Sequence, residues 1–239
     1  MLEIERLSKS FRGLRAAQDV SFAVPEGSII GLIGPNGAGK TTCFNMIAGV
    51  FRPDAGAVRF AGARIDGWRP DRVCAAGIGR TFQLVKPFAG LTVLDNVVVG
   101  ALLQEKAVSA AKRHAAEIVE KLGLGAKRDA LASSLTLPDR KRLEVARALA
   151  TRPKLLLLDE VMAGLRPTEC DQIIAVFREL NRAEGLSILL IEHVMRAVMA
   201  LAQGIVVLHH GEVIARGAPR EVVRDPAVLE SYLGEETEV

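Results

Sequence analysis

Short apolar runs bounded by turn residues recur along the chain and predict strands that are buried on both faces of a sheet. These runs cover residues 28–33, 154–158 and 187–191, and residues 77–83 are expected to add another strand. Apolar residues at helical spacing follow them and predict helices over residues 42–48, 168–184 and 194–202. Because strands and helices alternate, the pattern favours an α/β core built on a parallel sheet.

The N-terminal part of the chain has a different pattern, in which apolar and polar residues alternate. Residues 2–23 therefore predict antiparallel strands, and a hairpin is expected over residues 58–65. A short helix is expected to begin at Pro70, and a second hairpin covers residues 205–215. Two short helices are expected near the C-terminus, followed by a frayed acidic stretch at residues 235–238. These patterns add an antiparallel β subdomain to the core.

The middle of the chain shows only helical patterns. Thr92-Val93-Leu94-Asp95 matches a capping box that opens a helix. Helical periodicity continues over residues 105–122 and 139–151. We therefore expect a single domain of residues 1–239, in which a helical subdomain of about residues 86–151 is inserted in the core.

Composition and charge exclude several classes of protein. The 239 residues are 49% hydrophobic and 25% charged, which is ordinary for a globular protein with one large core. The net charge of +3 is too small to indicate nucleic-acid binding, and a single Trp and a single Tyr leave little for base stacking. The three cysteines are isolated, which favours a reduced cytosolic setting. The sequence shows neither a signal peptide nor an apolar run of membrane-spanning length.

A phosphate-binding pattern, G-x-x-x-x-G-K-[ST], lies between the first predicted parallel strand and its helix. In that setting successive backbone N–H groups and the positive end of the helix point at an anion. Lys40 is then placed to reach the β- and γ-phosphates of a nucleotide, and the Thr41 hydroxyl to bind Mg²⁺. The expected contacts of the nucleotide are Gly34, Pro35, Asn36, Gly37, Ala38, Gly39, Lys40, Thr41 and Thr42. The alternative is a glycine-rich turn with an exposed lysine.

A second candidate site lies at the end of the apolar strand 154–158, where Asp159 and Glu160 follow as adjacent carboxylates. A buried parallel strand presents its carboxyl end to the ligand crevice. Asp159 is therefore expected to hold Mg²⁺, directly or through water, and Glu160 to orient or deprotonate the water that attacks the γ-phosphate. The alternative is the acidic start of an ordinary helix, but the phosphate loop favours the catalytic interpretation.

Four features occur in the order typical of ABC-type ATPases. They are the phosphate loop, Gln83 after Arg80-Thr81-Phe82, the Asp-Glu strand end and His193 after a later apolar strand. The resemblance covers nearly the whole chain and implies a P-loop NTPase fold of the ABC type. Residues 77–83 (GIGRTFQ), 91–97 (LTVLDNV) and 208–214 (LHHGEVI) further resemble one branch, the ATPase subunits of bacterial branched-chain amino-acid importers.

The resemblance also implies roles for individual residues. Phe11 matches the aromatic side chain that stacks on adenine, with packing inside its own strand as the alternative. Gln83 matches the residue that senses Mg²⁺ and the attacking water, and His193 matches the histidine that contacts the γ-phosphate. His209 and His210 have only the context of a hairpin turn. The implied catalytic residues are Glu160, His193 and Gln83, and the implied metal ligands are Thr41, Gln83 and Asp159.

Two stretches depart from the family pattern. Members carry a Leu-Ser-Gly-Gly-Gln type of signature that meets the γ-phosphate of ATP held by the opposite subunit. The matching residues here are Leu135, Thr136, Leu137, Pro138 and Asp139. Thr136 keeps a hydroxyl, but Pro138 has no N–H to donate, although a proline is tolerated at a helix start. After Glu160, Val161 and Arg166 stand where the family often has a proline and an Asp or Asn, so we hypothesise an intact ATP-holding half and an altered signature half.

The function that the resemblance implies is ATP hydrolysis that energises uptake of branched-chain amino acids or related small molecules. The implied cofactors are ATP and Mg²⁺. The implied partners are a second ABC ATPase subunit, with a heterodimer favoured over a homodimer, two transmembrane permease subunits and, indirectly, a periplasmic substrate-binding protein. Gln83 and residues 85–96 are expected to touch the permease. The chain is then cytoplasmic and peripheral on the inner face of the plasma membrane, and nucleic acid is not expected to bind.

Three other functions compete with this one. A nucleotide-sensing subunit with weak hydrolysis fits the altered signature residues. The ATPase of a lipid or lipopolysaccharide exporter has a similar sequence, but the context of Arg80-Thr81-Phe82-Gln83 favours the importer branch. A soluble ABC ATPase of translation or DNA repair usually carries twin cassettes, a long coiled coil or a zinc insertion, and this chain shows none of them.

Overall fold

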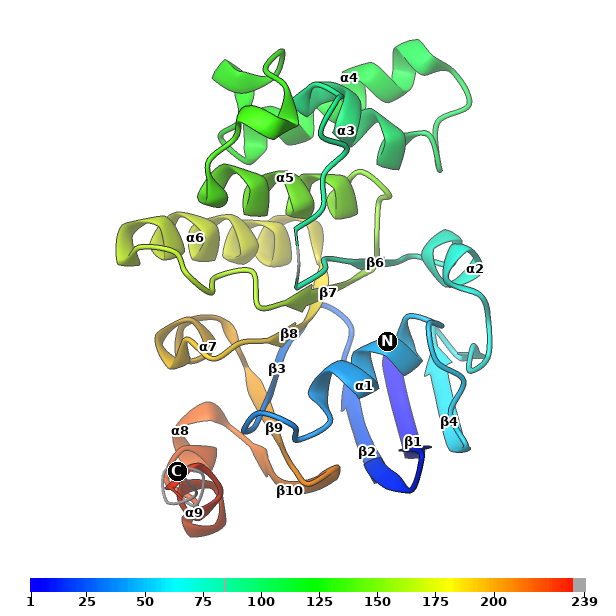
Figure 1. Ribbon diagram of the computed structural model, residues 1–239, viewed down its shortest axis with the longest axis vertical. Helices are drawn as coiled ribbons and strands as arrows, with labels where there is room; N and C mark the ends of the chain where they lie inside the picture. The colour runs from blue at the N-terminus through cyan, green and yellow to red at the C-terminus, as the bar shows by residue number, and fades with distance from the viewer. Residues whose placement is uncertain (84, 234–239) are drawn as a thin grey trace.

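The computed structural model describes residues 1–83 and 85–233. It contains two β-sheets and a separate group of helices (Figure 1). The helices of residues 93–149, in green, gather at one end of the molecule, and the strands of residues 2–60, in blue and cyan, lie toward the other. The mixed α/β architecture that the sequence predicts is therefore confirmed.

The larger sheet has six strands in the order β10-β9-β3-β8-β7-β6. The bounds of the strands are β3 Ile29–Ile33, β6 Ile78–Arg80, β7 Leu155–Asp159, β8 Ser187–Ile191, β9 Gly204–His209 and β10 Glu212–Gly217. All neighbouring pairs are parallel except β9 and β10, which form the predicted antiparallel hairpin. The carboxyl ends of β3, β7 and β8 consequently meet at one edge of the sheet, where ligands bind in open α/β folds.

The smaller sheet is antiparallel and has the strand order β2-β1-β4-β5. The bounds of its strands are β1 Leu2–Phe11, β2 Leu14–Val24, β4 Ala55–Phe60 and β5 Ala63–Arg64. The turn between β1 and β2 is formed by Arg12 and Gly13, which both have positive φ. Both predicted features of this region, the N-terminal antiparallel strands and the hairpin within residues 58–65, are present.

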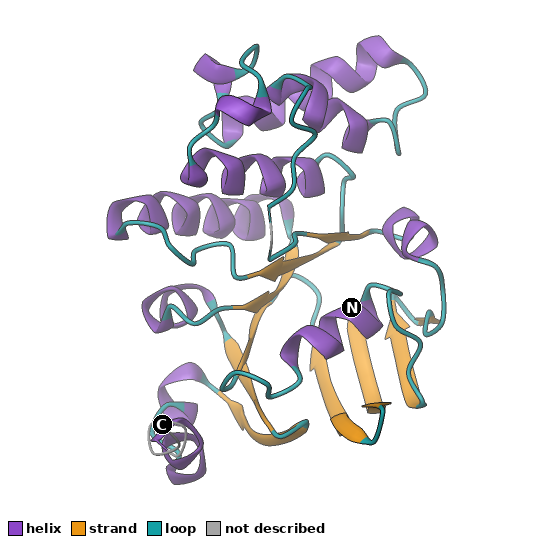
Figure 2. Cartoon of the chain, viewed as in Figure 1, coloured by secondary structure: helices purple, strands orange, loops and turns teal. Residues whose placement is uncertain are grey.

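Helices pack against the larger sheet, and two short helices are the last elements of the described chain (Figure 2). The bounds of these helices are α1 Lys40–Ile47, α2 Pro70–Ala75, α6 Pro167–Glu184, α7 Met195–Leu201, α8 Pro219–Val222 and α9 Pro226–Leu233. The ends of helix α6 carry residues that mark helix bounds in a sequence. It begins at Pro167, whose fixed φ suits a first helical position, and it is followed by Gly185 in the left-handed conformation.

The helical group at the end of the molecule consists of α3, α4 and α5. Their bounds are α3 Val93–Ala101, α4 Val108–Lys121 and α5 Leu137–Leu149, with 3₁₀ helices at Gly125–Lys127 and Ala132–Ser134. The predicted cap of α3 is confirmed, because the Thr92 hydroxyl oxygen accepts a hydrogen bond from the Asp95 N–H at 3.0 Å. Thr92 also forms an isolated antiparallel bridge with Leu131, and no strand is assigned to the described residues between β6 and β7.

Two hydrophobic clusters fill the interior, and the larger sheet separates them. Leu156 and Leu158 of β7 belong to the cluster shared with the helical group and α6. Leu155 and Leu157 belong to the cluster shared with α1 and the smaller sheet. The same alternation occurs along β3, β8 and β9. Burial on both faces explains why these strands are apolar at nearly every position, with Asp159, Ser187 and His209 at their ends as the polar exceptions.

Several predicted boundaries were wrong by a few residues. The first helix begins at Lys40 instead of residue 42, because Gly39 already caps it, and α5 begins at Leu137 instead of residue 139, because its first turn accommodates Pro138. The predicted helix 105–122 begins at Val108, because the N–H of Glu105 still bonds to the end of α3. The predicted strand 77–83 is limited to residues 78–80. The acidic stretch 235–238 lies outside the described residues.

Candidate functional site

The phosphate loop connects the end of β3 to the start of α1, and its conformation requires glycine at two positions. Gly34 and Gly39 have φ values of +146° and +98°. A Cβ atom on Gly34 would lie 2.0 Å from the carbonyl oxygen of Leu208, and one on Gly39 would lie 2.2 Å from that of Ala16. A larger residue at either position would displace the backbone, so the two glycines keep the loop and the first N–H groups of α1 in place.

The turn between β9 and β10 packs directly on this loop. The Gly211 N–H donates to the carbonyl oxygen of Ala38 at 3.1 Å, and the Gln18 N–H donates to the carbonyl oxygen of Gly211 at 2.7 Å. His210, in the same turn, lines the cleft in front of the phosphate loop. The sequence indicated only a hairpin turn for His209 and His210, which is correct for His210, whereas His209 is the last residue of β9. It gave no sign that this turn supports the loop.

A cleft of about 680 Å³ opens in front of the phosphate loop. This volume lies within the range of about 300–1,000 Å³ that small-molecule sites occupy. The lining residues are Phe11, Leu14, Arg15, Ala16, Gln18, Asn36, Gly37, Ala38, Gly39, Lys40, Thr41, Thr42, Gln83, Glu160 and His210. Phe11 is 37% exposed, and its ring also contacts Phe51 edge-on at a centroid distance of 5.1 Å. Both sequence interpretations of Phe11 therefore remain compatible with its position, and adenine stacking stays a prediction.

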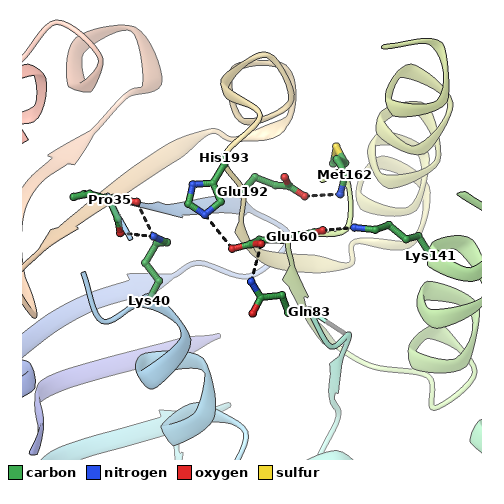
Figure 3. A network of polar contacts seen from close by, with 9 residues as sticks. Pro35, Lys40, Gln83, Lys141, Glu160, Met162, Glu192 and His193 are labelled. Carbon is green, nitrogen blue, oxygen red and sulfur yellow. Dashed lines mark hydrogen bonds and ion pairs between the residues drawn. The ribbon is translucent and has the colours of Figure 1, made fainter. Parts of the chain in front are cut away.

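Lys40 places a positive charge inside the loop. Its side chain is buried, and Nζ donates to the carbonyl oxygens of Gly34 at 2.6 Å and Pro35 at 2.7 Å (Figure 3). Lys40 and Glu160 both line the cleft in front of the loop. A cation held among backbone N–H groups at a helix start attracts phosphate oxygens.

Glu160 lies in the cleft and is held by two of the other predicted site residues. Its Oε1 is 3.0 Å from Nε2 of His193, and its Oε2 accepts a hydrogen bond from Nε2 of Gln83 at 2.9 Å (Figure 3). These residues follow the ends of three different strands, β7, β8 and β6. The structure therefore brings the three predicted catalytic residues into one hydrogen-bonded group beside the phosphate loop.

Asp159 is buried and forms an ion pair that the sequence analysis missed. Nη2 of Arg80 lies 3.3 Å from Asp159 Oδ2, and Nη1 of Arg80 donates to Oδ1 of Asn45 on α1 at 2.7 Å. Burial raises the pKa of the Asp159 carboxyl, and the Arg80 guanidinium offsets part of that increase. Arg80 stands in the motif GIGRTFQ, but only the fold shows that it reaches α1 and β7.

The oxygen atoms near Asp159 fit a magnesium ion. Asp159 Oδ1 is buried and has no hydrogen-bond partner among the residues that the structure describes. Thr41, Gln83 and Asp159, the three predicted metal ligands, line one cavity of about 420 Å³. Mg²⁺ prefers hydroxyl, amide and carboxylate oxygens and is usually bound by one or two carboxylates together with substrate phosphates. The donor set therefore suits this ion, and its binding remains a proposal.

The signature residues form the start of α5. Thr136 caps the helix, and Pro138 lies in its first turn, where its missing N–H leaves no helical hydrogen bond broken. The Thr136 hydroxyl donates to Oδ2 of Asp139 at 2.8 Å, and Asp139 also pairs with Lys127. Leu135 is buried, whereas Leu137 is 49% exposed. The hydroxyl expected to meet a partner's phosphate is thus engaged with a carboxylate of its own helix.

Comparisons with known proteins identify the family. The sequence profile described as ABC transporter matches residues 17–163, which is more than half of the chain. The chain belongs to the ABC transporter family. A second profile, described as branched-chain amino acid ATP-binding cassette transporter, matches residues 212–238. The predicted family and ATPase class are confirmed, and nucleotide binding follows from them.

Individual relatives agree with this assignment. The high-affinity branched-chain amino acid transport ATP-binding protein LivG of Salmonella typhimurium is 37% identical over 98% of both chains. The lipopolysaccharide export system ATP-binding protein LptB of Acidithiobacillus ferridurans is 36% identical over 100% of this chain and 99% of its own. A crystal structure of the ADP conformation of an ATP-binding cassette superimposes with a TM-score of 0.89 at 32% identity and covers 98% of both chains.

Within residues 1–83 and 85–233, none of the helices combines the length and the apolar character that crossing a bilayer requires.

Proposed function

We propose that this chain is the ATP-hydrolysing subunit of an importer for branched-chain amino acids or related small molecules. The observation that carries the ATPase part is the position of Glu160, which Gln83 and His193 hold in the cleft lined by the phosphate loop. The import part is supported by the similarity to LivG and by the match of residues 212–238 to the branched-chain amino acid profile.

The residues divide the reaction between binding and proton transfer. The loop N–H groups and Lys40 bind the β- and γ-phosphates, and Phe11 stacks on adenine. Glu160 orients the attacking water and accepts its proton, for which a carboxylate within hydrogen-bond distance of the water is suited. His193 contacts the γ-phosphate and keeps the Glu160 carboxylate aimed at the loop. Gln83 donates a hydrogen bond to Oε2 of Glu160, and it also lines the cavity that contains the proposed metal ligands Thr41 and Asp159.

Mg²⁺ is the cofactor that this donor set suits. Thr41, Gln83 and Asp159 would hold it, with the phosphates as further ligands. When bound, the ion neutralises negative charge that develops on the phosphate oxygens. Arg80 favours the charged form of Asp159 that a metal ligand requires, because it places a positive charge 3.3 Å from that carboxylate.

A second ABC ATPase subunit is needed to complete the site, and we favour a heterodimer over a homodimer. In such a pair the phosphate loop of this chain faces the signature residues of the partner. Pro138 offers no N–H to a phosphate, and Thr136 is already bonded to Asp139, so the reciprocal site is expected to be weak. The asymmetry argues for a partner with a complete signature.

The other proposed partners are two permease subunits and, indirectly, a periplasmic substrate-binding protein. Gln83 and residues 85–96 connect the catalytic group to the helical group and are the proposed permease contact. The chain then lies on the cytoplasmic face of the plasma membrane, attached through the permeases. We treat residues 1–239 as one ATP-binding domain with a helical subdomain of about residues 86–151, which shares one hydrophobic cluster with the larger sheet.

Lipopolysaccharide export is the second candidate, since LptB is nearly as similar as LivG. Proteoliposomes that contain this chain with its copurifying permeases and second ATPase subunit distinguish the two. We expect ATP-dependent uptake of radiolabelled leucine, isoleucine or valine, and no uptake with Lys40→Ala. Hydrolysis without uptake of any of the three would reject the import part. An intact complex that binds ATP but does not hydrolyse it would favour a nucleotide-sensing subunit.

A further inference from the structure

We propose that Lys141 and Glu192 are positioning residues for Glu160, which hold the loop after β7 from two sides so that the Glu160 carboxylate stays in the cleft. The inference rests on the proposed ATPase function and deepens it. Neither residue is among those that line the cleft, and neither belongs to the predicted site. Both are visible beside Glu160 in Figure 3.

The backbone of Glu160 needs to be held. Its φ is +52°, in the left-handed region that is unfavourable for a residue with a side chain. Residues keep such a conformation only where their surroundings enforce it. The Glu160 N–H donates to the carbonyl oxygen of Ile191 at 2.9 Å, which ties one side of the residue to β8. The carbonyl oxygen on the other side points toward α5.

Lys141 of α5 binds that carbonyl oxygen. Its Nζ donates to Glu160 O at 2.7 Å, and the side chain is only 6% exposed. An ammonium group is costly to bury unless it is paired. Burial lowers the pKa of Lys141, and the negative charges of Glu192 and Glu160 oppose that decrease. A buried lysine aimed at a backbone carbonyl, with carboxylates as its counter-charges, fixes the position of the Glu160 peptide.

Glu192 holds the chain on the far side of Glu160. Its Oε1 accepts a hydrogen bond from the Met162 N–H at 2.8 Å, and its side chain is 2% exposed. The other oxygen, Oε2, has no hydrogen-bond partner among the described residues. The Met162 N–H and then the positive charge of Lys141 favour the ionised form of this carboxylate. Glu192 also precedes His193, whose ring contacts Glu160. The hydrogen bond from Met162 to Glu192 therefore holds the loop that carries Glu160, and it also holds the backbone next to His193.

The arrangement has a catalytic consequence. Hydrogen bonds to Ile191, Lys141 and Met162 define the backbone on both sides of Glu160, and the side chain can then reach Gln83 and His193. Misplacement of a catalytic group by about 1 Å can cost about 100-fold in rate. Loss of Lys141 or Glu192 should therefore reduce turnover without weakening nucleotide binding, because neither residue lines the cleft in front of the phosphate loop.

The test measures ATP hydrolysis and binding of a fluorescent ATP analogue in the assembled complex. Lys141→Met should lower kcat by about 10–100-fold and leave KM and Kd within about twofold of the wild type. Lys141→Arg, which keeps a charged donor, should recover most of the lost activity. Lys112→Met and Glu117→Gln, on the exposed face of α4, serve as matched controls.

Two combinations separate positioning from a purely structural role. In the Glu160→Gln background, Lys141→Met should cause no further loss of the residual turnover, because it acts through Glu160. The double variant Lys141→Met with Glu192→Gln removes both buried charges and should regain stability while kcat stays low. Recovery of kcat together with stability would overturn the inference.

The outcomes also separate this inference from the proposed function. A wild-type complex that fails to hydrolyse ATP would reject the function itself. A wild-type complex that hydrolyses ATP, together with a folded Lys141→Met variant whose kcat stays within about twofold of it, would reject the inference and leave the function standing.

Discussion

Oε1 of Glu160 lies 3.0 Å from Nε2 of His193, although the two residues are 33 positions apart in the chain. The contact exists because β7 and β8 are adjacent parallel strands whose carboxyl ends meet at one edge of the sheet. Glu160 follows β7 and His193 follows β8 closely, so neighbouring strands deliver both side chains to the same cleft. The phosphate loop follows β3, the next strand along, and completes the site.

The two constrained glycines of the phosphate loop should differ from a third, less constrained one. Gly37 has φ +75°, but a Cβ atom added to it would have no atom within 4 Å, so Gly37→Ala should lower the free energy of unfolding by about 1–2 kcal/mol. Gly39→Ala adds a clash with the Ala16 carbonyl oxygen and should cost at least about 3 kcal/mol. Urea denaturation of both variants measures the difference. Equal costs would show that the contact with Ala16 does not constrain the loop.

The buried ion pair between Arg80 and Asp159 should be strongly coupled. Arg80→Met leaves an uncompensated carboxylate that is 1% exposed, and should lower the free energy of unfolding by about 3–5 kcal/mol. Adding Asp159→Asn removes the remaining charge and should restore most of that stability. Urea denaturation of the wild type and of the single and double variants, all without nucleotide, gives the free energies of unfolding for a double-mutant cycle. A loss below about 1 kcal/mol for Arg80→Met would indicate a pair screened by solvent.

Glu192 should make folding stability depend on pH. Burial raises the pKa of this carboxyl from 4.5 to about 7. A carboxyl group with a higher pKa in the folded chain binds its proton preferentially there, so ionisation lowers the free energy of unfolding as the pH rises from 4.5 to about 7. Glu192→Gln removes this dependence.

The stability of Glu192→Gln relative to the wild type should therefore increase by up to about 3 kcal/mol over that pH range. Urea denaturation at intervals between pH 4.5 and pH 8 measures it, and the difference between the two proteins cancels the titration of other groups. A difference that stays constant with pH would show that Glu192 is ionised in the folded chain throughout.

The altered signature predicts unequal active sites in the complex. Pro138 and the Thr136–Asp139 hydrogen bond leave the partner's ATP with a weak signature contact. Substituting Gln for the partner's catalytic glutamate should therefore lower total turnover by less than about threefold, whereas Glu160→Gln should lower it by about 100-fold or more. Steady-state phosphate release from the two singly substituted complexes makes the comparison. Equal losses would argue for two equivalent sites.

The sequence was sufficient for features that depend on short stretches. The pattern from Gly34 to Thr42 predicts the phosphate loop by itself, because its glycines and its lysine are neighbours in the chain and act in the same short turn. The uniformly apolar run before Asp159 likewise predicts a buried parallel strand. The predicted starts of three helices differ from the observed starts by two or three residues. The observed starts depend on backbone hydrogen bonds at Gly39, Thr136 and the end of α3, and no residue type specifies these bonds.

Features that depend on distant residues could not be predicted. Arg80 reaches Asp159 across 79 positions, and the Gly211 turn supports Ala38 from a hairpin at the far end of the chain. Lys141 looks like any charged residue of an amphipathic helix until its 6% exposure and its bond to Glu160 are known. The first two contacts follow from strand order and the third from the packing of α5 against the larger sheet, and the sequence pattern leaves both open.

Single-turnover phosphate release by the complex with Glu160→Gln in this chain tests the central claim most directly. We predict that the rate of phosphate release falls by about 100-fold or more, because the attacking water loses its base, while the fluorescent ATP analogue binds with a Kd within about twofold of the wild type. Phosphate release at the wild-type rate from a variant that still binds ATP would contradict the account, since Glu160 would then take no part in the cleavage.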